Sequence, residues 1–318
     1  MELLVTGASG FLGRNFLLAA PREWRITALY HRDAAFRDFL RHHGLEQVRP
    51  LRVDLTRPEG LTATGLAGRR FDACLYLAAW VDLPGSERRP RRDLEANQLA
   101  LLNLLEAVEL GRMVFLSSGA VYLGNQGLVN PQTPLGPSLP YAIHKLAAEG
   151  YLRFFAQRRG SIGDYAILRF MGAFGPYEPP HKIYTKMLQS FVLGEERRFT
   201  IYGDGSNLID AMYVEDAVRG LRAVLEGPPL NGVLDFGLGA PMSIRELVET
   251  TARVFGRQVE IVCQGRTAEE IRFFISPREM EQRFGFRPRI SFEEGIRRFA
   301  ERLPQLERTA RREGGEDS

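Results

Sequence analysis

Residues 3–13, with the sequence LLVTGASGFLG, combine a short apolar run with three glycines spaced three apart. The aliphatic residues 3–5 predict a buried strand, which ends at a turn that starts with Gly7. Apolar residues then recur at helical spacing from Phe11, and this pattern ends at Pro21, which cannot continue a helix. The glycines are therefore expected on a strand-to-helix turn.

Glycines on such a turn let the backbone approach a ligand closely, and the N-terminus of the helix offers unpaired N–H groups to a phosphate. Gly7, Gly10 and Gly13 follow the spacing G-x-x-G-x-x-G rather than the commoner G-x-G-x-x-G of dinucleotide sites. A tight turn without any ligand is the alternative interpretation. The motif therefore needs support from other parts of the chain.

The composition indicates an ordinary globular protein, because 44% of the 318 residues are hydrophobic and 25% are charged. A net charge of +3 with dispersed basic residues argues against a nucleic-acid partner. No apolar run approaches the roughly 18 residues that cross a membrane, and no signal peptide precedes the first strand. We therefore expect a cytoplasmic location without membrane contact. We identify no set of metal ligands in the sequence.

The two cysteines, Cys74 and Cys263, both lie in runs that predict strands. We expect them to be small buried side chains rather than a disulfide, which fits a reducing compartment.

Strands alternate with helices, joined by short turns, from the N-terminus to about residue 170. This pattern predicts the α/β class, a doubly wound, Rossmann-like parallel sheet with helices on both faces. Two of its helices are expected at about residues 92–111 and 139–158. We place the dinucleotide-binding domain at residues 1–168 plus 210–236, a smaller interleaved substrate domain at 169–209 plus 237–303, and a disordered tail at 304–318.

Tyr141 and Lys145 stand four residues apart on a predicted helix, so both side chains lie on one face. A tyrosine is a weak base near neutral pH, and a neighbouring ammonium would stabilise its phenolate. Ser118, at the end of the preceding predicted strand, could hold a substrate oxygen beside Tyr141. A solvated surface pair is the alternative for Tyr141 and Lys145 taken alone.

With these motifs the chain resembles the extended short-chain dehydrogenases/reductases, in particular their NAD(P)-dependent nucleotide-sugar epimerase/dehydratase branch. The resemblance runs from residue 3 to about residue 303. It rests on ordered motifs that include TGASGFLG at 6–13, FLSSGAVY at 115–122, PYAIHK at 140–145 and IYGDGSNLIDAMYVEDA at 201–217.

The resemblance implies that Ser118, Tyr141 and Lys145 form a catalytic triad, with Tyr141 as general acid/base and Lys145 also holding the nicotinamide ribose. The residues expected to bind the cofactor are Gly7, Gly10, Phe11, Leu12, Gly13, His31, Arg32, Asp54, Leu55, Leu77, Ala78, Ala79, Asn97, Tyr141 and Lys145. It also implies a homodimer in which the two helices at 92–111 and 139–158 pack against their copies.

The chain departs from the family pattern at the end of the second predicted strand. NAD-specific members carry an aspartate there, whereas this chain has Tyr30, followed by His31 and Arg32. An arginine could pair with the 2′-phosphate of NADP, which favours NADP slightly over NAD. A merely solvated Arg32 is the alternative.

Three further departures concern the substrate. The acid pair of the sugar 4,6-dehydratases is replaced by Gly119 and Ala120, so dehydration is not expected. Gly172 stands where an asparagine usually helps to hold the substrate, and Ile209 where an arginine usually pairs with the substrate's diphosphate.

The loss of the arginine makes other basic residues candidates for the substrate's phosphate. The chain has only three lysines, and Lys182 and Lys186 follow a Gly/Pro-rich loop. We therefore assign Ser118, Gly172, His181 and Lys182 to the substrate site.

The leading interpretation is an epimerase that transiently oxidises a ring hydroxyl of a sugar nucleotide or a related sugar. An NADP-dependent reductase or dehydrogenase of a sugar or sterol-like alicyclic substrate is the alternative. A cofactor-sensing protein without turnover is disfavoured because every position of the triad is filled.

Overall fold

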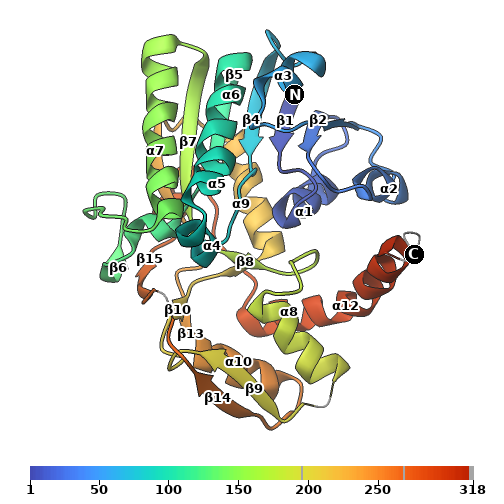
Figure 1. The fold of residues 1–318 in the computed structure, drawn as a ribbon, viewed down its shortest axis with the longest axis vertical. Helices are drawn as coiled ribbons and strands as arrows, with labels where there is room; N and C mark the ends of the chain where they lie inside the picture. The colour runs from blue at the N-terminus through green and yellow to red at the C-terminus, as the bar shows by residue number, and fades with distance from the viewer. Residues whose placement is uncertain (195, 268, 315–318) are drawn as a thin grey trace.

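Strand β1 (Glu2–Thr6) lies inside a seven-stranded sheet in the computed structural model, which describes residues 1–194, 196–267 and 269–314 (Figure 1). Every neighbouring pair of strands in this sheet is parallel. The strand order is β12 (Gly232–Phe236), β7 (Ile162–Phe170), β5 (Glu109–Ser118), β4 (Arg70–Tyr76), β1, β2 (Arg25–Tyr30) and β3 (Val48–Arg52). The expected doubly wound parallel sheet is confirmed.

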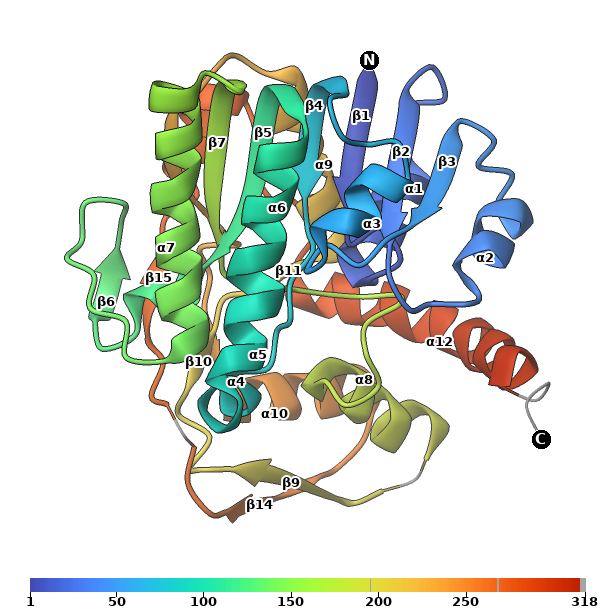
Figure 2. The same cartoon turned by 45° about the horizontal axis from the view of Figure 1, so that its top comes forward.

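Helices cover both faces of this sheet (Figures 1 and 2). One face carries α3 (Pro58–Ala63), α6 (Ala100–Ala107) and α7 (Pro140–Phe154); the other carries α1 (Phe11–Ala19), α2 (Phe36–His42) and α9 (Val214–Glu226). Each face has its own buried apolar cluster, as expected for a sheet that is covered twice.

The strand order reverses beside β1: β2 and β3 follow on one side of β1, and β4 and β5 continue the sheet on the other side. In an open α/β sheet, ligands bind at such a switch point, outside the carboxyl ends of the strands. This edge of the sheet faces the smaller, carboxyl-terminal part of the molecule (Figures 1 and 2).

That smaller part is built from short strand pairs and helices. The pairs are β8 (Ala173–Phe174) with β11 (Met212–Tyr213), β9 (Arg198–Tyr202) with β14 (Glu260–Gln264), β10 (Leu208–Ile209) with β13 (Met242–Ser243), and β6 (Gln126–Val129) with β15 (Arg272–Ile275). The helices are α8 (Ile183–Leu188), α10 (Ile244–Val254), α11 (Arg278–Phe284) and α12 (Phe292–Gly314). The apolar cluster on the α1 and α9 face continues into this part, from Leu3 to Phe299. The division into two domains remains a prediction.

The helix expected at residues 92–111 differs from the observed structure. Helix α5 (Pro90–Leu94), a π-helical turn (Glu95–Leu99) and α6 follow one another, and α6 ends at Ala107. Gly111 belongs to strand β5, where a Cβ atom would lie 2.6 Å from the carbonyl oxygen of Asp72. The helix expected to reach residue 111 therefore ends earlier, and Gly111 instead lets two strands approach closely.

Two other expectations are corrected. Helix α12 continues to Gly314, whereas the sequence predicts disorder from residue 304; its charged residues, Glu and Arg, are good helix formers. Residues 315–318 lie outside the described residues. Cys74 is buried on β4 inside the covered central sheet, whereas Cys263 is exposed because it lies on the small two-stranded ribbon of β9 and β14. Both thiols are free, as expected. Among the described helices, we find none with the length and apolarity needed to span a bilayer.

Candidate functional site

The glycine turn joins β1 to α1 as the sequence predicts, and each glycine has a steric reason. Gly7 has a φ angle of +63°, and a Cβ atom on it would lie 2.8 Å from the amide nitrogen of Ala78. A Cβ atom on Gly13 would lie 2.5 Å from the carbonyl oxygens of Gly7 and Ala8. Side chains at these positions would push the helix away from the turn.

Gly10 is the exposed N-cap residue of α1, and its amide donates to the carbonyl of Gly7 over 3.0 Å. No side chain caps this helix, so Phe11 and Leu12 present first-turn amides at the carboxyl edge of the sheet. These half-buried residues and the missing Cβ atoms fit the phosphates of a dinucleotide.

The loop after β4 forms the next part of this crevice. The hydroxyl of Thr6 accepts hydrogen bonds from the amides of Leu77 (3.1 Å) and Ala78 (3.0 Å), which ties the loop to β1. Ala79 is exposed. The amide side chain of Asn97 accepts from the backbone N–H of Trp80 and donates to its carbonyl, so it holds the loop from the other side.

The residues expected around the adenine ribose lie near the ends of β2 and β3. Tyr30 is buried, and its hydroxyl accepts a hydrogen bond from Arg37. His31 and Arg32 are exposed. His31 Nε2 lies 3.6 Å from a carboxylate oxygen of Asp54, so the structure brings these two predicted residues together.

The Asp54 carboxylate also accepts two hydrogen bonds from Thr56, one from its amide and one from its hydroxyl. Although partial burial raises the pKa of Asp54, these bonds outweigh it and leave the pKa below its ordinary value. The side chain of Leu55 is buried, and its carbonyl accepts from Asn103. Asp54 and Leu55 are therefore firmly positioned.

The predicted triad converges at the carboxyl ends of the central strands. Ser118 ends β5, its hydroxyl accepts from the amide of Ala120, and it lies close enough to Tyr141 to lower the pKa of the Tyr141 hydroxyl. Tyr141 lies in the first turn of α7, and Lys145 lies one turn further along. The Lys145 ammonium donates to the carbonyl of Leu116 over 2.9 Å. Sequence positions 118, 141 and 145 thus meet in one site.

Burial has the largest effect on the pKa values of Tyr141 and Lys145. It raises the pKa of Tyr141 to about 12, the Ser118 hydrogen bond lowers that pKa, and the charge of Asp93 raises it. Burial also lowers the pKa of Lys145 to about 8, against the opposing charges of Asp93 and Glu149. Ser118 is the side chain that lowers the pKa of Tyr141, and the Lys145 ammonium lies 5.9 Å from the centre of the Tyr141 ring.

A buried ionic network holds α7 on the sheet beneath the triad. Glu149 accepts two hydrogen bonds from the guanidinium of Arg169 on β7 and one from the hydroxyl of Ser117. The same guanidinium donates to the hydroxyl of Tyr122, which donates to Asp235. The network therefore couples α7 to three neighbouring strands, β5, β7 and β12.

The residues assigned to the substrate are less close to the triad. Gly172 has a φ angle of +127°, and its carbonyl accepts from the amide of Met212. Such a backbone conformation explains a glycine where the family pattern has an asparagine. His181 is exposed, and Lys182 is the N-cap residue of α8. The structure records no contact between these two side chains and the triad within the part of the chain that it describes.

Two acids near these residues have raised pKa values. Burial raises the pKa of Glu178 to about 7, although Thr185 and the charge of Lys182 lower it. Asp210 follows Ile209; burial raises its pKa to about 6, although backbone amides lower it. One Asp210 oxygen accepts from the amides of Gly239 and Ala240, and the other is buried without a protein partner.

Sequence reasoning missed Asp93 and His144, which lie beside the triad on α5 and α7. An acid on an amphipathic helix usually belongs to its solvated face, and only the position of His144 next to Lys145 could have drawn attention to it.

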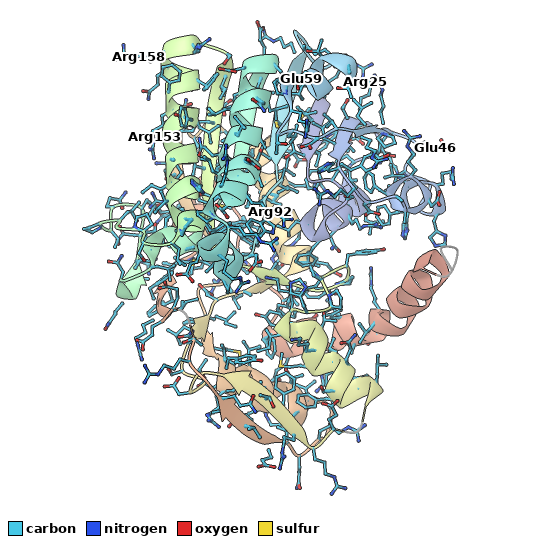
Figure 3. All side chains as sticks on the ribbon, viewed as in Figure 1. Arg25, Glu46, Glu59, Arg92, Arg153 and Arg158 are labelled. Atoms are coloured by element: carbon cyan, nitrogen blue, oxygen red, sulfur yellow. The ribbon has the colours of Figure 1, made fainter. Side chains whose placement is uncertain are left out.

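It also missed a cavity of about 270 Å³ lined by Trp80, Asp82, Gly85, Arg88, Arg89 and Arg92. Arg92 lies over the Trp80 ring. Its side chain projects from α5 (Figure 3).

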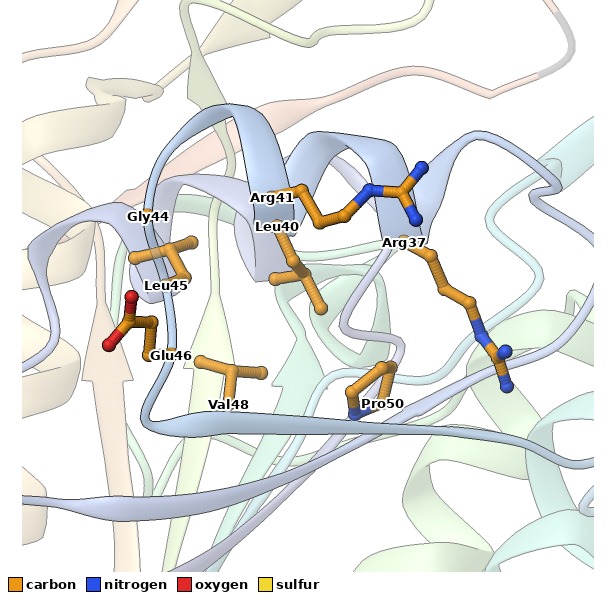
Figure 4. A pocket seen from close by; sticks show the side chains of 8 residues that line it. All are labelled: Arg37, Leu40, Arg41, Gly44, Leu45, Glu46, Val48 and Pro50. Carbon is orange, nitrogen blue, oxygen red and sulfur yellow. The ribbon is translucent and has the colours of Figure 1, made fainter.

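Another cavity, of about 440 Å³, lies between α2 and the edge strand β3 (Figure 4). It is lined by Arg37, Leu40, Arg41, Gly44, Leu45, Glu46, Val48 and Pro50. None of these residues belongs to the predicted cofactor, substrate or catalytic set, so the cavity is separate from the candidate site.

A Rossmann sheet whose carboxyl edge carries a glycine turn and a Ser–Tyr–Lys triad defines a dinucleotide-dependent enzyme of the oxidoreductase type. The chain belongs to the NAD dependent epimerase/dehydratase family, whose model matches residues 3–233. This confirms the resemblance to the extended short-chain dehydrogenases/reductases.

The relatives include both dehydratases and epimerases. The chain is 27% identical to a dTDP-glucose 4,6-dehydratase of Mycolicibacterium smegmatis, over 93% of this chain and 91% of that protein. It is 28% identical to an uncharacterized UDP-glucose epimerase of Bacillus subtilis, over 85% and 87%. The DesIV dTDP-glucose 4,6-dehydratase of Streptomyces venezuelae, with NAD bound, has a TM-score of 0.84 and 26% identity over 98% of both chains. The relatives give no support to NADP over NAD.

Proposed function

We propose that this protein is an NAD(P)-dependent epimerase of a nucleotide sugar or a related sugar, acting by transient oxidation of a ring hydroxyl. The observation that carries the proposal is the meeting of Ser118 at the end of β5 with the buried Tyr141 and Lys145, which lie one helical turn apart, at the carboxyl edge of a sheet with a glycine turn.

The bound nicotinamide would supply the hydride acceptor and donor. Tyr141 takes the proton of the substrate hydroxyl as the carbon is oxidised, and returns it after the hydride reaches the opposite face of the sugar. The Ser118 hydroxyl holds the same substrate oxygen. Lys145 supplies a positive charge that stabilises the phenolate, and it retains donors for a ribose beyond its bond to Leu116.

The positions after Ser118 favour epimerisation over loss of water. Elimination needs an additional acid and base, and Gly119 and Ala120 provide neither. A Cβ atom on Gly119 would lie 2.4 Å from the sulfur of Met171, so an acidic side chain would also require Met171 to move.

For the cofactor we propose a slight preference for NADP. Tyr30 leaves the end of β2 without the carboxylate that would repel a 2′-phosphate, and the exposed Arg32 lies two residues further on. The carboxylate of Asp33, next to Arg32, would repel a 2′-phosphate, but it forms an ion pair with Arg14 at 2.7 Å, which reduces this repulsion.

For the substrate's phosphates we propose Lys182 and His181 in place of the arginine that Ile209 replaces. The arginine-lined cavity beside Trp80 offers a second cationic surface, because Arg88, Arg89 and Arg92 form no ion pair with any acid among the residues that the structure describes. Several relatives are named for nucleotide sugars, which supports a substrate of this kind.

We also propose a homodimer, in the cytoplasm, that forms through α5, the π-helical turn and α7. Five large apolar side chains on these elements are 40% to 45% exposed: Leu94, Leu99, Ile143, Tyr151 and Phe154. Such a patch is the kind of surface that a second copy covers.

The test is to purify the protein, extract its cofactor, and incubate it with a panel of nucleotide sugars without added reductant. An epimerase retains its dinucleotide and converts one sugar into its epimer, which nuclear magnetic resonance detects. Turnover only with stoichiometric NADPH would instead support the alternative, a ketone reductase, which the missing arginine at 209 favours.

A further inference from the structure

Asp93 and His144 form a short contact beside the triad, between α5 and α7. Nδ1 of His144 lies 2.6 Å from one carboxylate oxygen of Asp93, and the Asp93 side chain has no exposed surface. Burying an ionised carboxylate without a partner costs free energy, and a short, charge-assisted hydrogen bond to a histidine offsets this cost.

The second Asp93 oxygen accepts from the side chain of Asn97 over 3.0 Å. Asn97 holds the backbone of Trp80, directly after the cofactor-lining residues 77–79. A continuous set of hydrogen bonds therefore joins the catalytic helix, through His144 and Asp93, to the loop that lines the crevice.

Asp93 also acts electrostatically on both members of the catalytic couple. Its negative charge raises the pKa of Tyr141 and also that of Lys145. The effect on Tyr141 disfavours its phenolate form, and the effect on Lys145 favours its charged ammonium form. The charge that Tyr141 experiences therefore depends on how far His144 balances Asp93.

Other charged groups on the packed elements already have partners or lie at the surface. Glu149, on α7, is held by Arg169. Arg153, on α7, lies 3.6 Å from Glu149. On α5 and the adjoining turn, Arg91 pairs with Glu95, and Arg92 lies over the Trp80 ring. Asp82 caps α4 (Leu83–Arg88), and Arg88 and Arg89 line the surface cavity. Asp93 and His144 are thus the pair whose charge balance reaches Tyr141.

We propose that Asp93 and His144 are a positioning pair for the reaction, which fixes α5 against the catalytic helix and whose net charge governs how readily Tyr141 releases its proton. The inference rests on the proposed role of Tyr141 as general acid/base.

Opposite effects of two isosteric changes test this pair. The protein is loaded with oxidised dinucleotide, and tyrosinate absorbance is recorded against pH, with the matching Tyr141→Phe protein subtracted to isolate Tyr141. Asp93→Asn removes the negative charge and should move the midpoint of the Tyr141 titration to lower pH by about one unit. His144→Gln leaves the carboxylate unbalanced and should move the midpoint to higher pH. The acid limb of the kcat profile should shift in the same directions.

Glu95→Gln is the matched control, because it removes the same charge from an exposed residue of the adjoining turn and should leave the midpoint unchanged. If both pair variants leave the midpoint unchanged, or move it in the same direction, the inference is overturned. If one variant fails to fold, the direction of the other still decides. Failure of the proposed function would appear separately, as turnover by Tyr141→Phe.

Discussion

The guanidinium of Arg169 donates two hydrogen bonds to the carboxylate of Glu149, at 3.0 and 2.9 Å, and both side chains are almost completely buried. Glu149 lies one turn beyond Lys145 on α7, and Arg169 lies near the end of β7. The pair therefore sets the position of the helix that carries the catalytic couple.

Glu149→Ala should lower the free energy of unfolding by about 3 to 5 kcal/mol, because it leaves the Arg169 charge buried without its partner. Urea unfolding followed by circular dichroism measures this loss. Glu95→Ala, at an exposed pair with Arg91, should change the stability by about 0.5 kcal/mol or less. Equal losses of unfolding free energy in the two variants would mean that the buried pair stabilises the protein no more than the exposed pair does.

Tyr141→Phe should abolish hydride transfer and leave cofactor binding nearly intact, because the phenol supplies acid/base chemistry rather than dinucleotide affinity. Turnover assays and calorimetric titration with the dinucleotide separate the two effects. Tyr151→Phe, on the exposed side of the same helix, is the control. Turnover at the wild-type rate in Tyr141→Phe would remove the proposed mechanism.

Arg32→Ala should weaken NADP binding by about 1.5 to 3 kcal/mol and leave NAD almost unchanged, because the variant loses a charge-assisted contact to the 2′-phosphate. Titration of both cofactors into both proteins checks this difference, with exposed Arg49 changed to alanine as control. Equal weakening, or tighter binding of NAD by the wild type, would assign the cofactor as NAD.

Lys182→Ala should raise the KM for a phosphorylated substrate by roughly tenfold, about 1.4 kcal/mol, with little change in kcat. Steady-state kinetics with the epimerised nucleotide sugar give both constants. The exposed Lys186, on α8, provides the control variant. An unchanged KM in Lys182→Ala together with a raised KM in Arg92→Ala would place the phosphate at the cavity beside Trp80 instead.

Light scattering at micromolar concentration should give the mass of a dimer. Phe154→Glu places a charge in the exposed apolar patch on α7 and should shift the protein toward the monomer. A charge at the more exposed Tyr202, outside the patch, should not. A monomeric wild type contradicts the proposed assembly.

The local parts of the site could be predicted from spacing alone. The glycines at 7, 10 and 13 lie on the turn that their spacing indicates, and Tyr141 and Lys145 lie on one helix, because neighbours in the chain decide both features. The alternation of strands and helices likewise predicts the parallel sheet, since parallel strands need a crossover connection.

Features that join distant segments could not be predicted in this way. Gly111 ends no helix, because contact with Asp72 in the next strand decides its conformation. Cys263 is exposed because its strand belongs to a two-stranded ribbon and not to the central sheet that helices cover on both faces.

The sequence by itself determined the class of fold, the glycine turn and the placement of Tyr141 and Lys145 on one face of a helix, since these follow from periodicity, glycine geometry and one helical turn. Only the tertiary structure decided that Ser118 lies beside Tyr141, that Arg169 holds Glu149, and that the buried Asp93 faces His144, 51 residues away. The physical reason is that burial and partner distance set the energy of a charge, and both arise only when separate helices and strands pack together.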